Sequence, residues 1–402
     1  MKKNIAVLLD NIPSDGGTYQ YNLTILDAFI KLPIDKFDKK ILYTNHHWDN
    51  KLKNTPFQKK YVRISDLQKK VFKLIASFGF NKHVRYIFLS IFSRNIAKSL
   101  NDKEIDLIIL PSQDVISLYI KTAKVNAIHD LMHRYESHFP EVSRFFQSKY
   151  RDILFSSFCK ESVAILVDSN VGKDQVNETY EIEKKRIFVL PFIPPSYIVD
   201  KIQINKDFKS LHFDWPEDYI IYPAQFWKHK NHENLLKAIS ILKNSGININ
   251  LVLTGKKTYD YNNLIIIIKE LNIEENVFFV NFIPEDYLKI VYSKSKGLVM
   301  PTFFGPTNIP PLEAVFSGCP VAVSNIYGMP EQLNDAALYF NPKKVEEIAD
   351  ALKILWTDES RCIELKKNGN KLMNNWNQDI FYKKFEMILI EVLTINTKFK
   401  VN

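Results

Sequence analysis

The sequence predicts an α/β protein with two successive doubly wound domains, each a parallel sheet covered by helices on both faces. Three observations lead to this prediction: the chain length, two sets of short apolar runs of β type, and helical patterns between many of those runs. The 402 residues are too many for a single hydrophobic core. Nearly all-apolar strands are typical of sheets covered on both faces, and their alternation with helices favours parallel order with right-handed crossovers.

The predicted strands fall into two groups along the chain. The first group comprises 5–10, 39–45, 60–64, 105–112, 124–130, 162–169 and 186–192, and the second 219–224, 249–255, 276–282, 297–301, 320–324 and 336–342. The stretch 191–218 contains several prolines and lacks a clear period, so the domain break is placed there. We therefore expect one domain over 1–198 and a second over 205–377. A long amphipathic helix is expected over 379–395.

Composition and cysteine use exclude several classes of protein. Hydrophobic residues make up 46% of the chain and charged residues 25%, which is typical of globular proteins. Cys159, Cys319 and Cys362 are widely spaced, which argues against a disulfide framework or a zinc site. The first apolar run ends at Asp10, which indicates a strand rather than a signal peptide, and no run of 18 apolar residues occurs. We expect a cytoplasmic protein without a membrane-spanning helix.

Positive charge is concentrated in one stretch of the first domain. Residues 51–100 hold 12 Lys and Arg residues and one acidic residue, Asp66. Within them, 69–100 interleaves aromatic and aliphatic residues with Lys and Arg at roughly helical spacing. Such a segment indicates a helix lying on an anionic membrane surface. The alternative is a pair of helices that pack on the first domain with basic residues in solvent. No nucleic-acid-binding motif is present, so nucleic acid is not an expected partner.

Residues 297–324 carry the most informative pattern, a strand, a loop, a helix and a second strand. The loop PTFFGPTNIPP lies between Met300 and a helix expected to open at Leu312 and to stop at Gly318. Open α/β sheets bind ligands at the carboxyl ends of their strands, and a helix amino end attracts anions such as phosphate. Glu313 is expected in the first helical turn, where it can accept hydrogen bonds from a ribose. The alternative is ordinary helix chemistry.

Gly16 and Gly17 follow the first predicted strand and precede a helix expected from about Tyr19. Two adjacent glycines let a backbone approach a diphosphate closely, and this chain holds only 11 glycines. The alternative is an ordinary turn.

His129 ends an apolar strand in the string VNAIHDL, and two further histidines follow in HDLMHRYESH. A histidine at a strand end is most often structural. The spacing of the histidines suits one helix face, but no H-E-x-x-H motif is present, so we expect no metal site.

A basic turn, QFWKHKNH, follows the first strand of the second domain. Lys228 and Lys230 in this turn can neutralise a diphosphate leaving group. The alternative is a solvated basic turn.

The string around Glu313 resembles the donor-site motif of glycosyltransferase family 4, whose usual pattern is E-G-F-G-L-P-x-L-E. The matching positions here are Pro310, Pro311, Leu312, Glu313, Ala314, Gly318, Pro320 and Val321. The first glutamate of the pattern falls on Gly305 and is absent. The family pattern G-R-x-x-x-x-K-N matches Lys230 and Asn231, but its arginine falls on Gln225.

The resemblance implies a GT-B fold, with two Rossmann-like domains facing a cleft and a last helix, within 378–402, that returns to the first domain. It implies catalytic roles for His129, Lys230 and Glu313: the histidine positions the donor sugar, the lysine stabilises the leaving diphosphate, and the glutamate binds the ribose. Donor contacts are implied for Gly16, Gly17, Gln225, Lys228, Thr254, Gly255 and Ile283, and for the loop residues Gly305, Thr307, Asn308 and Ile309.

The resemblance further implies a retaining, metal-independent glycosyltransferase that needs no cofactor and uses a nucleotide-diphosphate sugar as co-substrate. The acceptor is a glycan or polyprenyl-diphosphate-linked hydroxyl in bacterial surface polysaccharide or lipopolysaccharide assembly. The enzyme is expected to lie peripherally on the inner face of the plasma membrane. Two alternatives stay open: a GT-B sugar-phosphate epimerase or phosphorylase, and a catalytically degenerate nucleotide-sugar-binding or scaffold protein.

Overall fold

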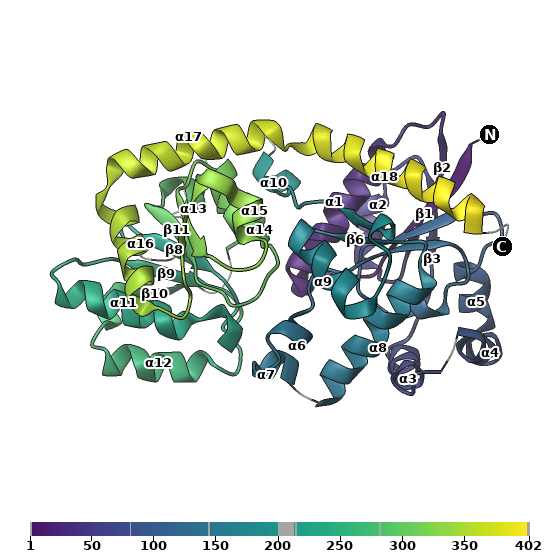
Figure 1. Ribbon diagram of the computed structural model, residues 1–402, viewed down its shortest axis with the longest axis horizontal. Coiled ribbons are helices and arrows are strands. Elements are labelled where there is room, and N and C mark those ends of the chain that lie inside the picture. The colour runs from purple at the N-terminus through teal and green to yellow at the C-terminus, as the bar shows by residue number, and fades with distance from the viewer. Residues whose placement is uncertain are drawn as a thin grey trace. The chain divides into compact units, whose positions relative to one another are not determined.

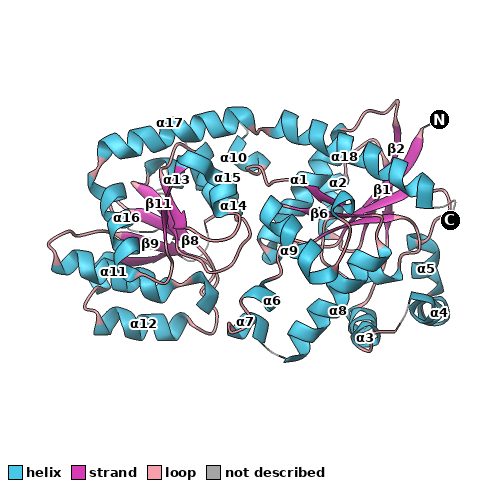
Figure 2. Ribbon diagram, viewed as in Figure 1, coloured by secondary structure: helices cyan, strands magenta, loops and turns pink. Residues whose placement is uncertain are grey.

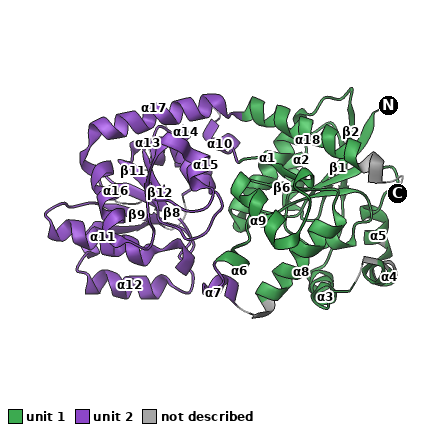
Figure 3. Ribbon diagram, viewed as in Figure 1, with its two compact units in different colours: residues 1–135, 144–191, 378–402 green, residues 136–143, 192–377 purple. Residues whose placement is uncertain are grey.

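The structure is a computed structural model that describes residues 2–80, 82–143, 145–199, 213, 215–280 and 283–399. The chain forms two compact units (Figure 3). Unit 1 comprises residues 1–135, 144–191 and 378–402, and unit 2 comprises 136–143 and 192–377. The boundary lies at Pro191 and Phe192, whereas the sequence placed it between 198 and 205, and 205 lies outside the described residues. The short segment 136–143 groups with unit 2, which the sequence did not predict.

Unit 1 is built on a seven-stranded parallel sheet in the order β3-β2-β1-β4-β5-β6-β7. Among these strands, Figure 1 labels β1, β2, β3 and β6. Its strands are β1 (Lys3–Leu9), β2 (Phe37–Tyr43), β3 (Gln58–Tyr61), β4 (Leu107–Leu110), β5 (Lys124–Ala127), β6 (Ala164–Val167) and β7 (Ile187–Val189). Its helices are α1 (Gly17–Lys31), α2 (His47–Leu52), α3 (Asp66–Ser77), α4 (Lys82–Phe92), α5 (Arg94–Leu100), α6 (Met132–Tyr135), α8 (Phe145–Glu161), α9 (Asn170–Tyr180) and α18 (Gln378–Phe399). The central strand β1 is buried from Ile5 to Leu9, with Val7 in register with Ile41 and Ile109.

Unit 2 has a six-stranded parallel sheet in the order β10-β9-β8-β11-β12-β13. Its strands are β8 (Ile220–Pro223), β9 (Leu251–Thr254), β10 (Val277–Val280), β11 (Gly297–Met300), β12 (Val321–Ser324) and β13 (Ala337–Phe340). Its helices are α7 (Pro140–Ser143), α10 (Ser196–Val199), α11 (His232–Asn244), α12 (Tyr261–Glu270), α13 (Glu285–Lys294), α14 (Ile309–Phe316), α15 (Met329–Leu333), α16 (Val345–Thr357) and α17 (Glu359–Asn375). Figure 2 shows helices on both faces of this sheet.

The expectation of two doubly wound α/β domains is confirmed. Each of the thirteen apolar runs overlaps one of the strands, and ten of them contain it fully; β1, β2 and β3 each begin two residues before the predicted run. In each sheet the strand order reverses at one place, between β1 and β4 in unit 1 and between β8 and β11 in unit 2. Such switch points are where doubly wound sheets bind ligands, because the loops on the two sides diverge and leave a crevice. The loops after β1, β8 and β11 follow strands at these switch points.

The predicted C-terminal helix is α18, and it belongs to unit 1, as the resemblance implied. Lys36 and Glu386 form an ion pair of 2.7 Å that joins α18 to the segment before β2. Within unit 2, the indole N–H of Trp376 donates a hydrogen bond to the carbonyl of Phe192 at 3.0 Å. Among the described residues, no helix is long and apolar enough to cross a membrane.

Candidate functional site

The loops that follow β8 and β11 are fastened to each other at the switch point of unit 2. Asn231 adopts a left-handed conformation, which asparagine tolerates better than most residues, and its side-chain amide donates to the carbonyls of Pro301 and Pro342 at 2.9 and 2.8 Å. The N–H of Phe303 donates to the carbonyl of His229 at 2.8 Å. The His229 ring stacks on Phe304 with centroids 3.9 Å apart. The two loops thus form one rigid rim at the carboxyl edge of the sheet.

Gly255 brings the loop after β9 against the same rim. A Cβ atom at this position would lie 2.3 Å from the carbonyl oxygen of Ala224, and the backbone φ of +154° is one that other residues rarely adopt. Only glycine permits this approach. Thr254, which ends β9, is buried beside it, so both predicted residues lie at the carboxyl edge of the sheet.

Helix α14 begins at Ile309, three residues before the start that the sequence suggested. Pro310 and Pro311 lie inside its first turn, where proline is well tolerated because the missing N–H groups would have no helical partner. Glu313 is consequently the fifth residue of the helix rather than a first-turn residue. The two prolines also remove N–H donors from the expected anion site. Of the first three residues of the helix, Ile309 alone has an N–H group. The N–H of Asn308 is already donated to Gln332 at 3.1 Å.

The Glu313 side chain is turned toward the protein interior. It is 5% exposed, and its two carboxylate oxygens accept hydrogen bonds from the hydroxyls of Tyr197 and Tyr292. Burial raises the pKa of this carboxyl, while the two hydroxyl bonds act in the opposite direction. In this structure Glu313 links α14 to α10 and α13, a structural role that the sequence did not predict.

The basic turn after β8 is a 3-10 turn over Lys228–Lys230. Lys228 is exposed and Lys230 is half-buried, and the hydroxyl of Tyr222 fixes the turn by donating to the Lys230 carbonyl at 2.8 Å. Gln225 accepts a hydrogen bond from the Trp227 indole at 2.7 Å. The predicted base contact Ile283 is 4% exposed and packs into the core of unit 2, so it offers little surface to a ligand.

A carboxylate from segment 136–143 already lies against this turn. Glu141 accepts hydrogen bonds from the backbone N–H of Lys228 at 2.6 Å and from the Tyr259 hydroxyl at 2.8 Å, and its Oε1 lies 3.3 Å from His229 Nδ1. Burial acts to raise the pKa of Glu141, but the bonds from His229 and Tyr259 outweigh it and hold the pKa at about 2. The turn therefore accepts an anion, although here the anion belongs to the chain itself.

The loop from Gly305 to Asn308 is held by its own polar groups. The Asn308 amide donates to the Phe304 carbonyl at 3.2 Å, and its backbone carbonyl accepts from the Gln332 side chain at 2.9 Å. A Cβ at Gly305 would stand 3.5 Å from Thr307 N and from Tyr327 Cβ, which is ordinary contact. The glycine that replaces the family glutamate is therefore not demanded by lack of space.

The switch point of unit 1 carries the glycine pair. Gly16 has φ +60° and ψ −123°, a conformation that favours glycine, and it precedes α1, which opens at Gly17. Beside it, after β1, Asp10 is packed near Asp114. Burial, and then the charge of Asp114, raise the pKa of Asp10 to about 7. The predicted glycine loop thus lies at the carboxyl edge of its sheet, next to a pair of carboxyl groups that the sequence did not single out.

His129 follows β5 on the same edge of the unit 1 sheet. Its Nε2 lies 3.2 Å from the carbonyl of Pro111, and its ring meets the edge of Tyr21 with centroids 4.6 Å apart. Because a carbonyl only accepts, Nε2 carries the proton in this contact. Burial lowers the pKa of His129 to about 4, so the imidazole is neutral at pH 7.

The structure adds three residues to the unit 2 rim that sequence reasoning missed: Glu141, His229 and Tyr259. His229 lies inside the basic string and was overlooked in favour of its lysine neighbours. Glu141 and Tyr259 carry no signal in the sequence, because each comes from a segment distant from the turn and reaches it only through the fold.

The match to a known family falls within unit 2. The model of the family described as glycosyl transferases group 1 matches residues 203–372. The O-antigen chain mannosyltransferase RfbU of Salmonella typhimurium is 28% identical over 236 residues, which cover 56% of this chain and 61% of that protein. The chain thus spans less than two thirds of this curated relative.

Solved structures decide the fold. Sucrose-phosphate synthase from Thermosynechococcus elongatus aligns with a TM-score of 0.69 at 16% identity, over 98% of this chain and 100% of that one. HepE from Anabaena, solved in complex with UDP, aligns with a TM-score of 0.63 at 16% identity, over 100% and 98%. The chain has the GT-B fold. The residues matched by the family model, 203–372, lie in unit 2. The rim of this unit is formed by the loops after β8, β9 and β11.

Proposed function

We propose that the protein is a retaining glycosyltransferase of the family 4 type. It transfers a sugar from a nucleotide-diphosphate sugar to a hydroxyl of a glycan or lipid-linked acceptor, in the assembly of a bacterial surface polysaccharide. The observation that carries the proposal is the rim of unit 2. There the family-like strings around Lys230 and Glu313, far apart in the sequence, are joined at the switch point of the sheet.

In this proposal the turn over Lys228–Lys230 receives the leaving diphosphate. The bond between the anomeric carbon and the diphosphate breaks, the acceptor oxygen bonds to the same face of the sugar, and the diphosphate takes the acceptor proton. Lys230 stabilises the charge that develops on the leaving group. The binding of Glu141 at the same turn supports anion recognition there. A carboxylate and a phosphate both accept hydrogen bonds, and the turn offers N–H, imidazole and hydroxyl donors.

His129 is proposed to position the donor sugar from unit 1. Its neutral state suits this role, because a neutral histidine can orient hydroxyls without attracting the diphosphate. The charge handling by lysines, together with the absence of an Asp-x-Asp string from the sequence, is the basis for proposing a metal-independent reaction.

The relatives favour a mannosyl or other hexosyl donor and an O-antigen-like product. RfbU is named as an O-antigen chain mannosyltransferase, and HepE was solved with UDP. A thermal-shift panel of UDP-, GDP-, dTDP- and CDP-sugars tests the donor, followed by a transfer assay with the sugar that stabilises most. Stabilisation by one nucleotide sugar together with transfer supports the proposal. Stabilisation without transfer or hydrolysis identifies a degenerate binding protein instead, and the absence of any shift refutes donor binding.

Glu313→Ala is expected to weaken nucleoside diphosphate binding at least about tenfold, because a lost charged hydrogen bond to a ribose hydroxyl costs roughly 1.5–3 kcal/mol. Glu313 is 5% exposed and its carboxylate is enclosed by two tyrosine hydroxyls, so we expect ribose binding to displace one of them. We assign this exchange to Tyr197, which lies on the four-residue helix α10, rather than to the fully buried Tyr292.

Calorimetric titration with nucleoside diphosphate measures this effect, and thermal unfolding measures the structural cost of unpaired tyrosines. Glu313→Gln is the matched variant, since it keeps the shape and one acceptor oxygen. If folded Glu313→Ala binds nucleoside diphosphate as tightly as the wild type, the residue is only a structural link between helices.

Asn308→Ala is expected to change donor choice or turnover more than nucleotide affinity. With Gly305 in place of the family glutamate, the loop that Asn308 holds is left to contact the donor sugar. Turnover with two donor sugars, measured beside nucleotide affinity, checks this expectation. Equal rates and preference in the variant would count against it.

The protein is further proposed to lie on an anionic membrane surface through α3 and α4. Ser65 starts α3 with a capping box, in which its hydroxyl accepts from the Gln68 N–H and its own N–H donates to the Gln68 side chain. One face of α3 buries Phe72, Ile75 and Ala76. A second apolar face, spaced as one helical stripe, is exposed to solvent and consists of Leu67, Val71, Leu74 and Phe78.

The next helix, α4, also exposes large apolar side chains: Ile87 and Ile91 lie one turn apart and are 58% and 70% exposed. Lys70 and Lys73 are also exposed on α3. One residue of the basic stretch does not belong to this surface: Arg85 is 2% exposed and bound to Glu161, so its charge is neutralised inside unit 1. Large exposed apolar side chains beside lysines are typical of a helix that lies on a lipid surface, and less typical of a helix that faces only water.

A further inference from the structure

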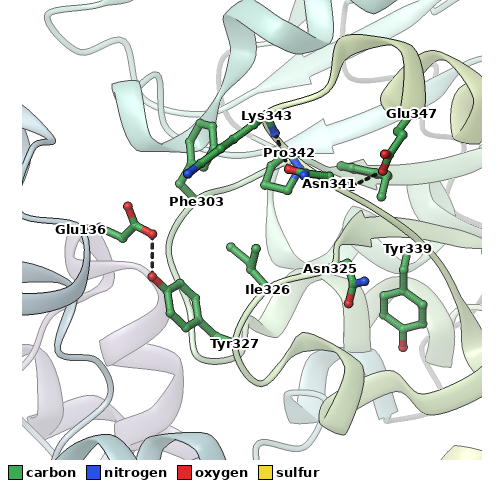
Figure 4. Close-up of a pocket in the computed structure, with 11 residues that line it drawn as sticks. Glu136, Phe303, Asn325, Ile326, Tyr327, Tyr339, Asn341, Pro342, Lys343 and Glu347 are labelled. Carbon is green, nitrogen blue, oxygen red and sulfur yellow. Dashed lines mark hydrogen bonds between the residues drawn. The ribbon is translucent and has the colours of Figure 1, made fainter.

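A cavity lies on the same edge of the unit 2 sheet, beside the loop after β11. It has a volume of about 400 Å³ and is formed by the loops after β12 and β13, by Phe303 and by Glu136 (Figure 4). Cavities that bind small molecules usually span roughly 300–1,000 Å³. Its walls combine the rings of Phe303, Tyr327 and Tyr339 with the amide of Asn325 and the carboxylates of Glu136 and Glu347.

Tyr327 is held in this cavity against its conformational preference. Its φ is +48°, in the left-handed region where a bulky residue is unfavourable and glycine is usual. The cost of such a conformation is of order 1–3 kcal/mol, and it tends to be found at functional sites. The Tyr327 hydroxyl donates to Glu136 Oε1 at 2.5 Å, which fixes the ring on the wall of the cavity (Figure 4).

The cavity is coupled to the loop of the proposed donor site. The N–H of Gly328 donates to the carbonyl of Pro306 at 2.9 Å, so the loop after β12 is anchored on the loop after β11. Phe303 belongs to both the rim and the cavity. Its N–H donates to the His229 carbonyl in the rim, and the residue also lines the cavity. Segment 136–143 closes the other side, where Phe139 packs on Phe303 with centroids 5.2 Å apart.

The lining discriminates between classes of ligand. Two carboxylates and one lysine, Lys343, line the cavity, so it has no excess of positive charge to favour a phosphate. Glu347 already accepts from the N–H of Asn341 at 2.7 Å and pairs with Lys344 at 2.9 Å. The hydroxyls of Tyr327 and Tyr339 already donate to Glu136 and to the Asn334 carbonyl, so the lining offers chiefly aromatic rings and the side-chain amides of Asn325 and Asn341. These groups suit the apolar ring faces and the hydroxyls of a neutral sugar.

We propose that this cavity is a saccharide-binding subsite that takes a neutral pyranose unit, with Tyr327 as its stacking platform. Together with the proposed function, the sugar belongs to the glycan acceptor and lies near the donor loop. The binding of the sugar itself does not depend on that function, because the lining residues recognise a pyranose without any nucleotide.

Saturation-transfer NMR and titration measure the binding of methyl α-mannoside and an α-linked mannotriose to the 402-residue chain, without nucleotide. Wild-type protein is expected to bind the trisaccharide, and Tyr327→Gly to weaken this binding by about tenfold, the effect of losing one aromatic stacking partner. Glycine relieves the strain at φ +48°, which offsets part of the stability lost with the ring and its bond to Glu136, and thermal unfolding of the variant shows whether it is folded at the temperature of the titration. Tyr327→Phe is the matched control, since it keeps the ring and loses only the bond to Glu136, and it should retain most of the binding.

Equal binding by wild type and Tyr327→Gly, no binding by wild type, or displacement of the sugar by inorganic phosphate each overturns the proposal. Nucleotide-sugar thermal shifts of the same variants separate the two hypotheses. Saccharide binding without any nucleotide-sugar shift keeps the subsite and refutes the transferase. A nucleotide-sugar shift in protein that binds no saccharide refutes the subsite alone.

Discussion

Replacing Lys230 with alanine is expected to lower turnover by about a hundredfold or more, the usual effect of removing one preorganised charge donor at a leaving group. The structure makes this residue more important than the family pattern alone would. Gln225 stands where the family has an arginine, and Pro310 and Pro311 remove two N–H donors from the first turn of α14. Positive charge at the leaving diphosphate therefore has to come from the lysines.

Steady-state kinetics with the preferred donor measure this effect, and an unchanged unfolding temperature shows that the fold is intact. Lys269→Ala is the matched control, because Lys269 is an exposed lysine of α12 that lies outside the rim and its loss removes the same charge from unit 2. A Lys230→Ala enzyme with near wild-type turnover would remove this residue from the mechanism.

The strands could be predicted from the sequence because buried parallel strands are written as short apolar runs. Val7 and Leu253, for example, lie in runs that have no polar face to break the pattern. The order of the strands could not be predicted, because an apolar run does not encode its neighbour. The switch points, and hence the positions of the two candidate sites, follow only from that order.

Errors in the site arose where local sequence competes with tertiary contact. Pro310 and Pro311 were assigned to a loop from the sequence, although proline is well tolerated in the first turn of a helix and both lie in the first turn of α14. Glu313 matched a ligand-binding pattern, yet two tyrosines from other helices reach it in the folded chain. Arg85 was counted with an exposed basic face, and its burial depends on Glu161, which lies 76 residues away. No local signal carries contacts of this kind.

The contribution of segment 136–143 to the rim could not be predicted either, because it depends on tertiary contacts. Segment 136–143 interrupts unit 1 in the sequence, but Glu141 and Phe139 anchor it on unit 2. Its sequence, ESHFPEVS, has no period and no known motif. Only the three-dimensional contacts assign it to the anion-binding turn and to the saccharide cavity, where Glu136 binds Tyr327.

The double variant Lys70→Ser and Lys73→Ser is expected to reduce binding to anionic liposomes by about thirtyfold at low salt, since each basic residue near such a surface contributes about 1 kcal/mol. High salt should release much of the wild-type protein as well, because the attraction is screened. The stripe Leu67, Val71, Leu74 and Phe78 should leave a remainder that salt does not release, since inserted apolar side chains are not affected by screening. Substituting Leu74 and Phe78 with serine should abolish that remainder.

The matched control is the double variant Lys184→Ser and Lys185→Ser. These two exposed lysines of unit 1 lie outside the apolar stripe, and the variant removes the same charge. Co-sedimentation with neutral and anionic vesicles measures all four proteins. Equal partition of the wild type to both kinds of vesicle, or an equal loss in the control pair, would show that the basic helices are simply solvated.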